Sequence, residues 1–276
     1  MLSCSAGLSS PLYTHFLFFP QKEIRTTPEE IGGIARQDVT ISVGKSKIYG
    51  WYFKNPASPY VVLVSHGNGG NIGSVRWIAN NLISAGASVL LYDYRGYGMS
   101  DGHPTVESIC GDGDAAYTYL TKTAGYTPDK VIVYGQSLGC AVACSVADKH
   151  QVAGMILQSG FSSLRHVAFQ HFPILQHAPM LVPNALDNAS ILGRCNAPLL
   201  VIHGDDDKVV PFDNGEELFK AASGTKYMVV CHNSGHRLFP ESNEQHRDAV
   251  QTFIKEIMSG APPSVKVSHT ELPSHG

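Results

Sequence analysis

A short apolar run that ends in a Gly-x-Ser-x-Gly pattern constrains the fold of this chain more than any other feature. Residues 131–134 (Val-Ile-Val-Tyr) predict a buried strand, and the small residues after Ser137 predict a helix. Gly135 and Gly139 lack the side chains that would collide where a strand turns sharply into a helix. The pattern alone is frequent by chance, but this context places Ser137 at the tip of a strained corner, the arrangement called a nucleophile elbow.

Strand and helix patterns alternate along the rest of the chain. The continuous apolar run 61–64 is typical of a strand covered on both faces of a parallel sheet. The other expected strands cover residues 39–43 and 48–53, which form an entry hairpin, and 89–92, 131–134, 152–157, 199–203 and 226–230. The expected helices cover residues 72–85, 106–123, 137–150, 213–222 and 244–258. This alternation predicts an α/β fold with a mainly parallel, twisted sheet and helices on both faces.

The length of 276 residues suits one large domain with a sizeable core. We assign residues 1–35 to an N-terminal arm, residues 36–260 to the domain and residues 261–276 to a loose tail rich in polar residues. Residues 161–194 interrupt the alternation with three prolines and several aromatic side chains. We expect this interruption to form a small lid over the site.

Composition and charge narrow the class of protein. The chain is 43% hydrophobic and 16% charged, with a formal net charge of -3 and no dense cluster of Lys and Arg, so we do not expect nucleic acid as a partner. The six cysteines form no Cys-x-x-Cys pair, which favours free thiols in a reducing compartment and therefore a cytoplasmic location. Cys140 and Cys144 share one helix face and are expected to pack in the core.

The first 20 residues allow two interpretations. They contain no acidic residue, Lys or Arg and end in residues 16–20 (Phe-Leu-Phe-Phe-Pro), yet they offer neither an uninterrupted apolar span nor the basic start of a signal peptide. The favoured interpretation is an arm that packs its aromatic side chains on the domain. The alternative is a peripheral membrane contact through this arm, with Cys4 acylated.

An activated serine needs a base that takes its proton and an acid that orients and stabilises that base. The candidates occur in the order Ser137, Asp207 and His236, which is the order of an α/β-hydrolase. Each follows an expected strand, so all three should meet at one edge of the sheet. Gly235 should allow a sharp backbone turn before His236. The alternatives to Asp207 are its neighbours Asp205 and Asp206, and we expect His203 and His232 to be structural.

The chemistry also requires an oxyanion hole made of two backbone N–H groups. We expect the amides of Leu138, directly after the nucleophile, and of Asn68, in the loop His66-Gly67-Asn68. A phosphate-binding loop is the alternative, but the chain has neither Gly-x-x-x-x-Gly-Lys nor Gly-x-Gly-x-x-Gly. We expect no metal and no organic cofactor. Asp93 and Arg95 should hold their loop by hydrogen bonds rather than take part in the reaction.

Taken together, these segments resemble the α/β-hydrolases over residues 18–258. The matching segments, in order, cover residues 18–20, 48–52, 66–68, 92–100, 135–139, 203–207 and 235–236. The chain is most similar to the small-lid branch that includes protein depalmitoylases and microbial relatives. This resemblance implies a thioesterase or carboxylesterase with Ser137, Asp207 and His236 as the triad. The depalmitoylases carry an N-terminal cluster of cysteines, whereas here only Cys4 stands in that position.

We therefore expect a serine hydrolase that cleaves an ester or thioester of a small-molecule or acylated substrate through an acyl-enzyme. Ser137 excludes the alkyl-enzyme chemistry of relatives that place aspartate at this corner. A peptidase or lyase on the same triad and a non-catalytic binding protein on a hydrolase fold are the alternatives. The lid should either cover a fatty-acyl chain or pack its own core, through Phe161, Phe169, Phe172, Leu175, Met180, Leu181 and Val182.

Overall fold

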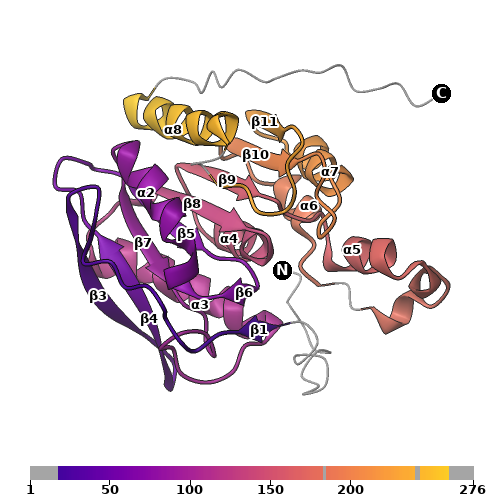
Figure 1. The fold of residues 1–276 in the computed structure, drawn as a ribbon, viewed down its shortest axis with the longest axis horizontal. Coiled ribbons are helices and arrows are strands. Elements are labelled where there is room, and N and C mark those ends of the chain that lie inside the picture. The colour runs from indigo at the N-terminus through magenta and orange to yellow at the C-terminus, as the bar shows by residue number, and fades with distance from the viewer. Residues whose placement is uncertain (1–17, 183–184, 240–242, 261–276) are drawn as a thin grey trace.

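A nine-stranded sheet forms the centre of the computed structural model, which describes residues 18–182, 185–239 and 243–260. The strand order is β11-β10-β9-β8-β5-β7-β4-β3-β2, and pairing is parallel from β11 to β7 and antiparallel from β7 to β2 (Figure 1). The strands are β2 (Glu30–Ile31), β3 (Ile34–Val43), β4 (Ser46–Phe53), β5 (Val61–Ser65), β7 (Ser88–Tyr92), β8 (Val131–Gln136), β9 (Gly154–Gln158), β10 (Leu199–Gly204) and β11 (Lys226–Cys231).

The helices pack on both faces of the sheet, and their buried side chains belong to two apolar clusters, one on each face. Side chains of α3 (Val106–Thr118) and α4 (Leu138–Lys149) belong to one cluster, and side chains of α2 (Arg76–Ser84) and α8 (Glu244–Ser259) belong to the other. Alternate residues of β5 divide between the clusters, with Leu63 in the first and Val62 in the second. The strand is therefore covered on both faces, as its continuous apolar run predicts.

The helices end close to the predicted boundaries, with two local differences. The expected helix 72–85 begins as a 3₁₀ turn, η1 (Ile72–Val75), capped by the side chain of Asn71, before α2 starts. The expected helix 106–123 ends its α-helical part at Thr118 and continues as a π-helical turn, η2 (Tyr119–Thr123). A further 3₁₀ turn, η3 (Pro128–Lys130), leads into β8.

The N-terminal residues contribute strands that the sequence patterns did not predict. β1 (Phe19–Pro20) pairs in parallel with β6 (Gly69–Gly70), and β2 pairs with β3, which starts at Ile34 rather than at residue 39. Runs of two residues are too short to show a strand period. Part of the predicted arm 1–35 thus pairs with the domain. Cys4 and the predicted tail 261–276 lie outside the described residues.

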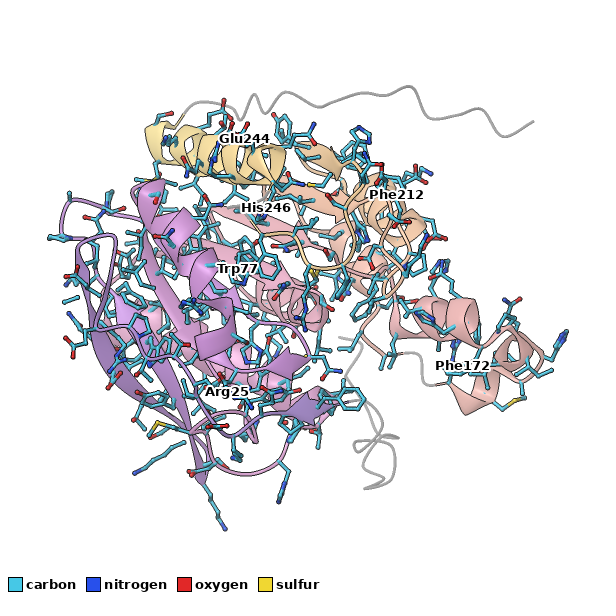
Figure 2. All side chains as sticks on the ribbon, viewed as in Figure 1. Arg25, Trp77, Phe172, Phe212, Glu244 and His246 are labelled. Carbon is cyan, nitrogen blue, oxygen red and sulfur yellow. The ribbon has the colours of Figure 1, made fainter. Side chains whose placement is uncertain are left out.

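Within the predicted lid 161–194, residues 164–181 form short helical elements that project from the rest of the domain, whereas residues 188–192 pack against α4 (Figure 1). The lid contains α5 (Leu164–His171), the 3₁₀ turns η4 (Pro173–His177) and η5 (Pro179–Leu181), and α6 (Asn188–Leu192). Figure 2 shows Phe172 on the projecting part. The helix α7 (Asp213–Ala221), which follows β10, packs beside α6.

Candidate active site

Ser137 occupies a strained corner between β8 and α4. Its backbone has φ 52° and ψ -117°, a left-handed φ that a residue with a side chain adopts rarely. The two glycines explain how the chain fits there. A Cβ on Gly139 would lie 1.9 Å from the carbonyl oxygen of Ser65, and one on Gly135 would lie 2.5 Å from the Cα of Cys140. The predicted elbow geometry is therefore present, with Ser137 half-buried at its tip.

His236 follows β11 and reaches the serine. Its Nε2 lies 3.0 Å from Ser137 Oγ, and its Nδ1 lies 2.7 Å from Asp207 Oδ2. The hydroxyl of Ser159 donates to the His236 carbonyl at 3.0 Å and so fixes the loop. Within this loop, Asn233 has a positive φ of 52°, and Gly235 is not among the glycines with a positive φ. That Gly235 allows the sharp turn stays a prediction. The imidazole bridges the hydroxyl and the carboxylate.

Asp207 is buried behind His236 and is fully hydrogen-bonded. Its Oδ1 accepts from the backbone amides of Val209, at 2.8 Å, and Val210, at 2.9 Å, while its Oδ2 faces His236 and lies 3.4 Å from His203 Nε2. Burial raises the pKa of Asp207, but the hydrogen bonds from His203, His236 and the Val210 amide outweigh it and hold the pKa below its ordinary value. The group remains a carboxylate that can stabilise a charged imidazole.

The alternative acids are engaged elsewhere. Asp205 Oδ2 lies 2.8 Å from His232 Nδ1, and Asp206 Oδ1 lies 2.6 Å from Lys208 Nζ. His203 is buried and its Nε2 also lies 2.9 Å from the carbonyl of Val210. Of the three neighbouring carboxylates, it is therefore Asp207 that meets His236.

The loop after β5 lies beside the elbow. A Cβ on Gly67 would lie 3.5 Å from the Cβ of Ser137. Leu138, the other predicted donor, is the first residue of α4 and is buried. The structure thus brings both predicted donor segments next to Ser137. That the amides of Asn68 and Leu138 bind an oxyanion stays a prediction.

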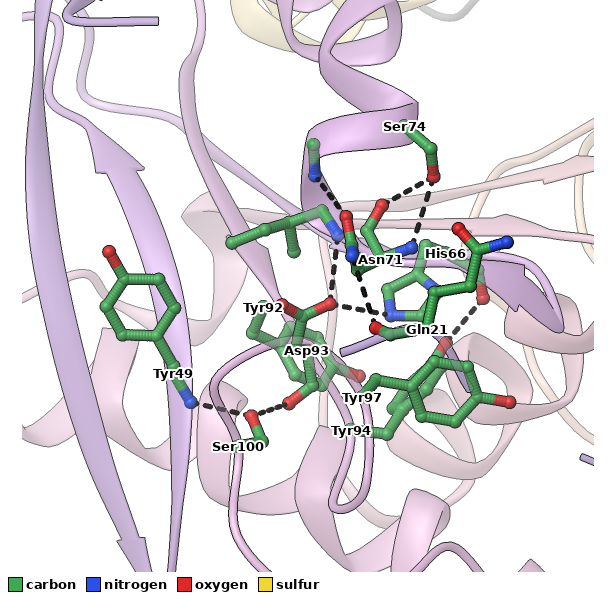
Figure 3. Close-up of polar contacts among 12 residues, drawn as sticks. Gln21, Tyr49, His66, Asn71, Ser74, Tyr92, Asp93, Tyr94, Tyr97 and Ser100 are labelled. Carbon is green, nitrogen blue, oxygen red and sulfur yellow. Dashed lines mark hydrogen bonds and ion pairs between the residues drawn. The ribbon is translucent and has the colours of Figure 1, made fainter. Parts of the chain in front are cut away.

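Asp93 holds this loop from below through contacts that Figure 3 shows. Its Oδ1 accepts from the Ile72 amide at 2.9 Å and lies 3.3 Å from His66 Nε2. The hydroxyl of Tyr94 donates to the His66 carbonyl at 2.7 Å, and that of Ser100 donates to the Asp93 carbonyl at 2.7 Å. These residues connect the loops after β5 and β7.

Arg95 binds away from the serine. Its Nε lies 2.7 Å from Asp112 Oδ1, and its Nη2 donates to the Ser108 carbonyl at 2.9 Å. Asp93 and Arg95 both hold their loop, as predicted. The tyrosine and serine partners of this network were missed, and the alternation of Tyr with charged residues over 92–97 is the signal that could have indicated them.

Within the described ranges, no group of three or more His, Cys, Asp or Glu side chains is arranged to hold a metal ion. In the same ranges, no helix combines the length and the apolar character needed to cross a bilayer. A surface groove lined by Glu30, Arg76, Trp77 and Phe239, among others, contains none of the predicted site residues. The five described cysteines are free thiols, and Cys140 and Cys144 are buried in the core as predicted.

Comparison with known proteins identifies the family of proteins to which this fold and the turn at Ser137 belong. Residues 57–194 match the family model described as serine aminopeptidase, S33. The chain is 32% identical over 203 residues to human alpha/beta hydrolase domain-containing protein 17B, covering 73% of this chain and 68% of that protein. The chain therefore belongs to the α/β-hydrolase superfamily, and its relatives make it a hydrolase.

Two further similarities extend over most of the chain. An uncharacterised protein of Mycobacterium tuberculosis is 32% identical over 244 residues, which is 87% of this chain and 86% of that protein. The solved structure of a Pyrococcus furiosus esterase superimposes with a TM-score of 0.72 at 20% identity, covering 88% of this chain and 98% of the esterase. The predicted fold class, a mainly parallel sheet with helices on both faces, is confirmed.

Proposed function

We propose that the protein cleaves an ester or thioester through a covalent acyl-enzyme on Ser137. The observation that carries the proposal is the continuous hydrogen-bonded line from Asp207 Oδ2 through His236 to Ser137 Oγ, with contacts of 2.7 and 3.0 Å. These distances are within reach of direct proton transfer. The strained elbow supports the same role, because it holds the hydroxyl away from the helix that follows.

In this mechanism, Ser137 Oγ attacks the carbonyl carbon while His236 Nε2 takes the hydroxyl proton. The Asp207 carboxylate stabilises the resulting imidazolium at Nδ1. The carbonyl oxygen becomes an anion and accepts hydrogen bonds from the amides of Asn68 and Leu138. When the bond to the leaving group breaks, His236 gives its proton to the departing alcohol or thiol. Water then attacks the acyl-enzyme in the same way, releasing the acid and restoring Ser137.

The lid supports a substrate with an apolar acyl group. Residues 161–186 contain no Asp or Glu, and the one carboxylate of the lid, Asp187, caps α6 by accepting a hydrogen bond from the Ser190 amide. Its apolar side chains divide into two sets. Phe161 and Val182 are buried and pack the domain, whereas Phe172 and Met180 are exposed. The exposed set is available to cover a fatty-acyl chain, an occupant that also suits the resemblance to depalmitoylases. Phe169 and Leu175 are half-buried, and the Leu181 side chain lies outside the described part.

A serine peptidase on the same residues is the second candidate, since the matching family model is described as a serine aminopeptidase. Turnover of a panel of acyl esters, acyl thioesters and aminoacyl amides separates the two, because the peptidase alternative requires the amides to be preferred. A non-catalytic binding protein would turn over none of them.

Labelling with a fluorophosphonate probe tests the proposal directly. We expect the native protein to be labelled and Ser137→Ala to be unlabelled, with activity reduced on the order of 10⁴-fold or more. Ser145→Ala, on the same helix α4, is the matched control and should be labelled like the native protein. Labelling that persists in Ser137→Ala would exclude Ser137 as the nucleophile.

The proposal includes a cytoplasmic location. A peripheral membrane contact through residues 1–17 is an addition to it that is tested separately. The exposed side chain of Phe19 adds apolar surface close to this segment. Cell fractionation of the full chain and of a chain lacking residues 1–17 tests the contact. If both sediment with membranes to the same extent, the arm is not the anchor.

A further inference from the structure

The strand β1 lies directly against the loop that carries Asn68. Phe19 pairs with Gly69 and Pro20 pairs with Gly70, so the two-stranded sheet begins one residue after Asn68. We propose that the Phe19 amide and the Tyr97 hydroxyl are positioning groups that lock the Asn68 peptide in place for the developing oxyanion. This inference rests on the proposed function, and it assigns a role in the reaction to two groups outside the triad and the oxyanion donors.

The side chain of Asn68 is held at one atom from two directions. Its Oδ1 accepts from the Phe19 amide at 3.1 Å and from the Tyr97 hydroxyl at 2.9 Å. A carboxamide oxygen has two acceptor sites, and these two donors use both. Because the side chain is fixed at its far end, rotation of the Asn68 backbone would break both hydrogen bonds. Under the proposed function, the Asn68 amide that would bind the oxyanion is therefore oriented through contacts of the Asn68 side chain.

The strand β1, which carries the Phe19 amide, is itself anchored to the domain. Phe18 is 4% exposed and belongs to the main apolar cluster. The Gln21 amide donates to the Gly70 carbonyl at 3.3 Å, and the Gln21 carbonyl accepts from the Gly98 amide at 2.9 Å. Asn71 Nδ2 donates to the Glu23 carbonyl at 2.7 Å. Residues 18–23 thus bridge the loops after β5 and β7, and Phe19 is held in place.

Tyr97 is anchored as firmly. Its side chain is buried and its ring lies in edge contact with His66, with ring centroids 5.2 Å apart, and with Tyr94, with centroids 5.6 Å apart. The ring packing sets the place of the hydroxyl independently of Asn68. Removing the hydroxyl alone therefore leaves the packing intact while freeing one side of the carboxamide.

An oxyanion donor acts only on charge that forms in the transition state, so its misplacement lowers kcat more than it changes KM. Loss of one whole donor costs about 10²-fold to 10³-fold in kcat. Loosening a donor that remains present costs less, and we expect about tenfold. This split between kcat and KM distinguishes positioning of Asn68 from a general loss of folded protein, which would lower the number of active sites.

Two variants each remove one of the hydrogen bonds to Asn68 Oδ1. Tyr97→Phe deletes the hydroxyl and keeps the ring, and Phe19→Pro deletes the backbone N–H at an exposed site. On a short acyl p-nitrophenyl ester, we expect each to lower kcat about tenfold with KM within about twofold. Affinity for an alkyl boronic acid, which becomes a tetrahedral adduct on Ser137, should fall by the same factor as kcat/KM. Phe19→Ala keeps the N–H, so its effect on kcat should be at least about fivefold smaller than that of Phe19→Pro.

The concentration of active sites, titrated with the fluorophosphonate probe, and the thermal midpoint are measured for every variant. Three results would overturn the inference: unchanged kcat in Tyr97→Phe and Phe19→Pro, equal effects of Phe19→Pro and Phe19→Ala, or lower kcat with unchanged boronic acid affinity. All three leave the proposed function intact as long as Ser137→Ala is inactive. Activity that survives in Ser137→Ala contradicts the proposed function itself.

Discussion

The loops around Ser137, at the carboxyl ends of the parallel strands (here called the sheet edge), and the lid are held by different kinds of interaction. At the sheet edge, backbone atoms of neighbouring loops approach so closely that Gly139 has no room for a Cβ beside Ser65. At the end of the lid, Phe172, Ile174 and Met180 are 63%, 74% and 79% exposed on short 3₁₀ turns. Under the proposed function, this difference predicts that the close-packed loops fix the triad and that the lid selects the acyl group.

The two regions meet at the loop that carries Asp207. His171 Nε2, at the end of α5, lies 2.8 Å from the Val209 carbonyl, and Gln170 Nε2 donates to Asp213 Oδ2 at 2.6 Å. Val209 in turn donates its amide to Asp207. The base of the lid therefore shares a segment with the acid of the site, while the exposed end has few partners among the described residues.

The largest expected effect falls on the sheet edge. Asp207→Asn should lower kcat roughly 10⁴-fold for every substrate alike, because an amide donor toward His236 Nδ1 favours the wrong tautomer of the imidazole. Asp205→Asn and Asp206→Asn are the matched controls, since these carboxylates bind His232 and Lys208 instead. Steady-state kinetics on two acyl esters measures all three variants. A comparable loss in either control would move the acid to that residue.

Close packing of the elbow predicts the next effect, on stability. Gly139→Ala should lower the free energy of unfolding by about 3 kcal/mol or more, because the new Cβ meets backbone atoms that cannot move aside. Gly193→Ala, at the end of α6 in the lid, has no atom closer than 3.6 Å to the new Cβ and should change the free energy by less than about 1 kcal/mol. Denaturant unfolding measures both, and similar losses would contradict the contrast.

Acid should destabilise the fold through His246, which packs against the sheet. His246, buried in α8 near Trp77, has its pKa lowered from 6.5 to about 4 by burial. The unfolded chain therefore binds this proton first, so stability present above pH 6.5 is lost as the pH falls toward 4, by at most about 3 kcal/mol. His246→Gln should flatten the unfolding free energy over this window. A slope that survives in His246→Gln would assign it to another group.

The smallest effect is expected at the lid. Phe172→Ala should lower kcat/KM for long-chain relative to short-chain p-nitrophenyl esters by about threefold to tenfold, with the free energy of unfolding changed by less than about 0.5 kcal/mol. Met99→Ala, at a site exposed to a similar degree outside the lid, is the control. Native activity that peaks at acetyl and vanishes for longer chains would rule out an acyl site under the lid.

The sequence predicts the parts of the site that depend on local pattern. Gly135, Ser137 and Gly139 lie in one stretch whose flanking strand and helix are both strongly patterned, so the corner could be predicted. The sequence favours Asp207 as the acid but leaves Asp205 and Asp206 open, because three consecutive carboxylates share a loop and only the path of the chain decides which one faces His236.

The contacts that hold the loop carrying Asn68 could not be predicted from the sequence either. Asn68 is 49 residues from Phe19 and 29 from Tyr97, and no periodic pattern links positions so far apart. β1 is two residues long, which is below the length at which alternation can be recognised. Such contacts are set by the packing of neighbouring loops and become visible only in the folded chain.

The wide spacing of the reacting groups has a consequence for how the protein is made. Ser137 and His236 are 99 residues apart, and the histidine follows the last strand of the sheet, β11. Under the proposed function, a chain still on the ribosome carries Ser137 before His236 has been made, so the triad cannot be complete until β11 has been synthesised. Contacts between such distant residues form late in folding. The rate at which activity returns after dilution from denaturant should therefore report how fast β11 and the segment that carries His236 pack onto the sheet.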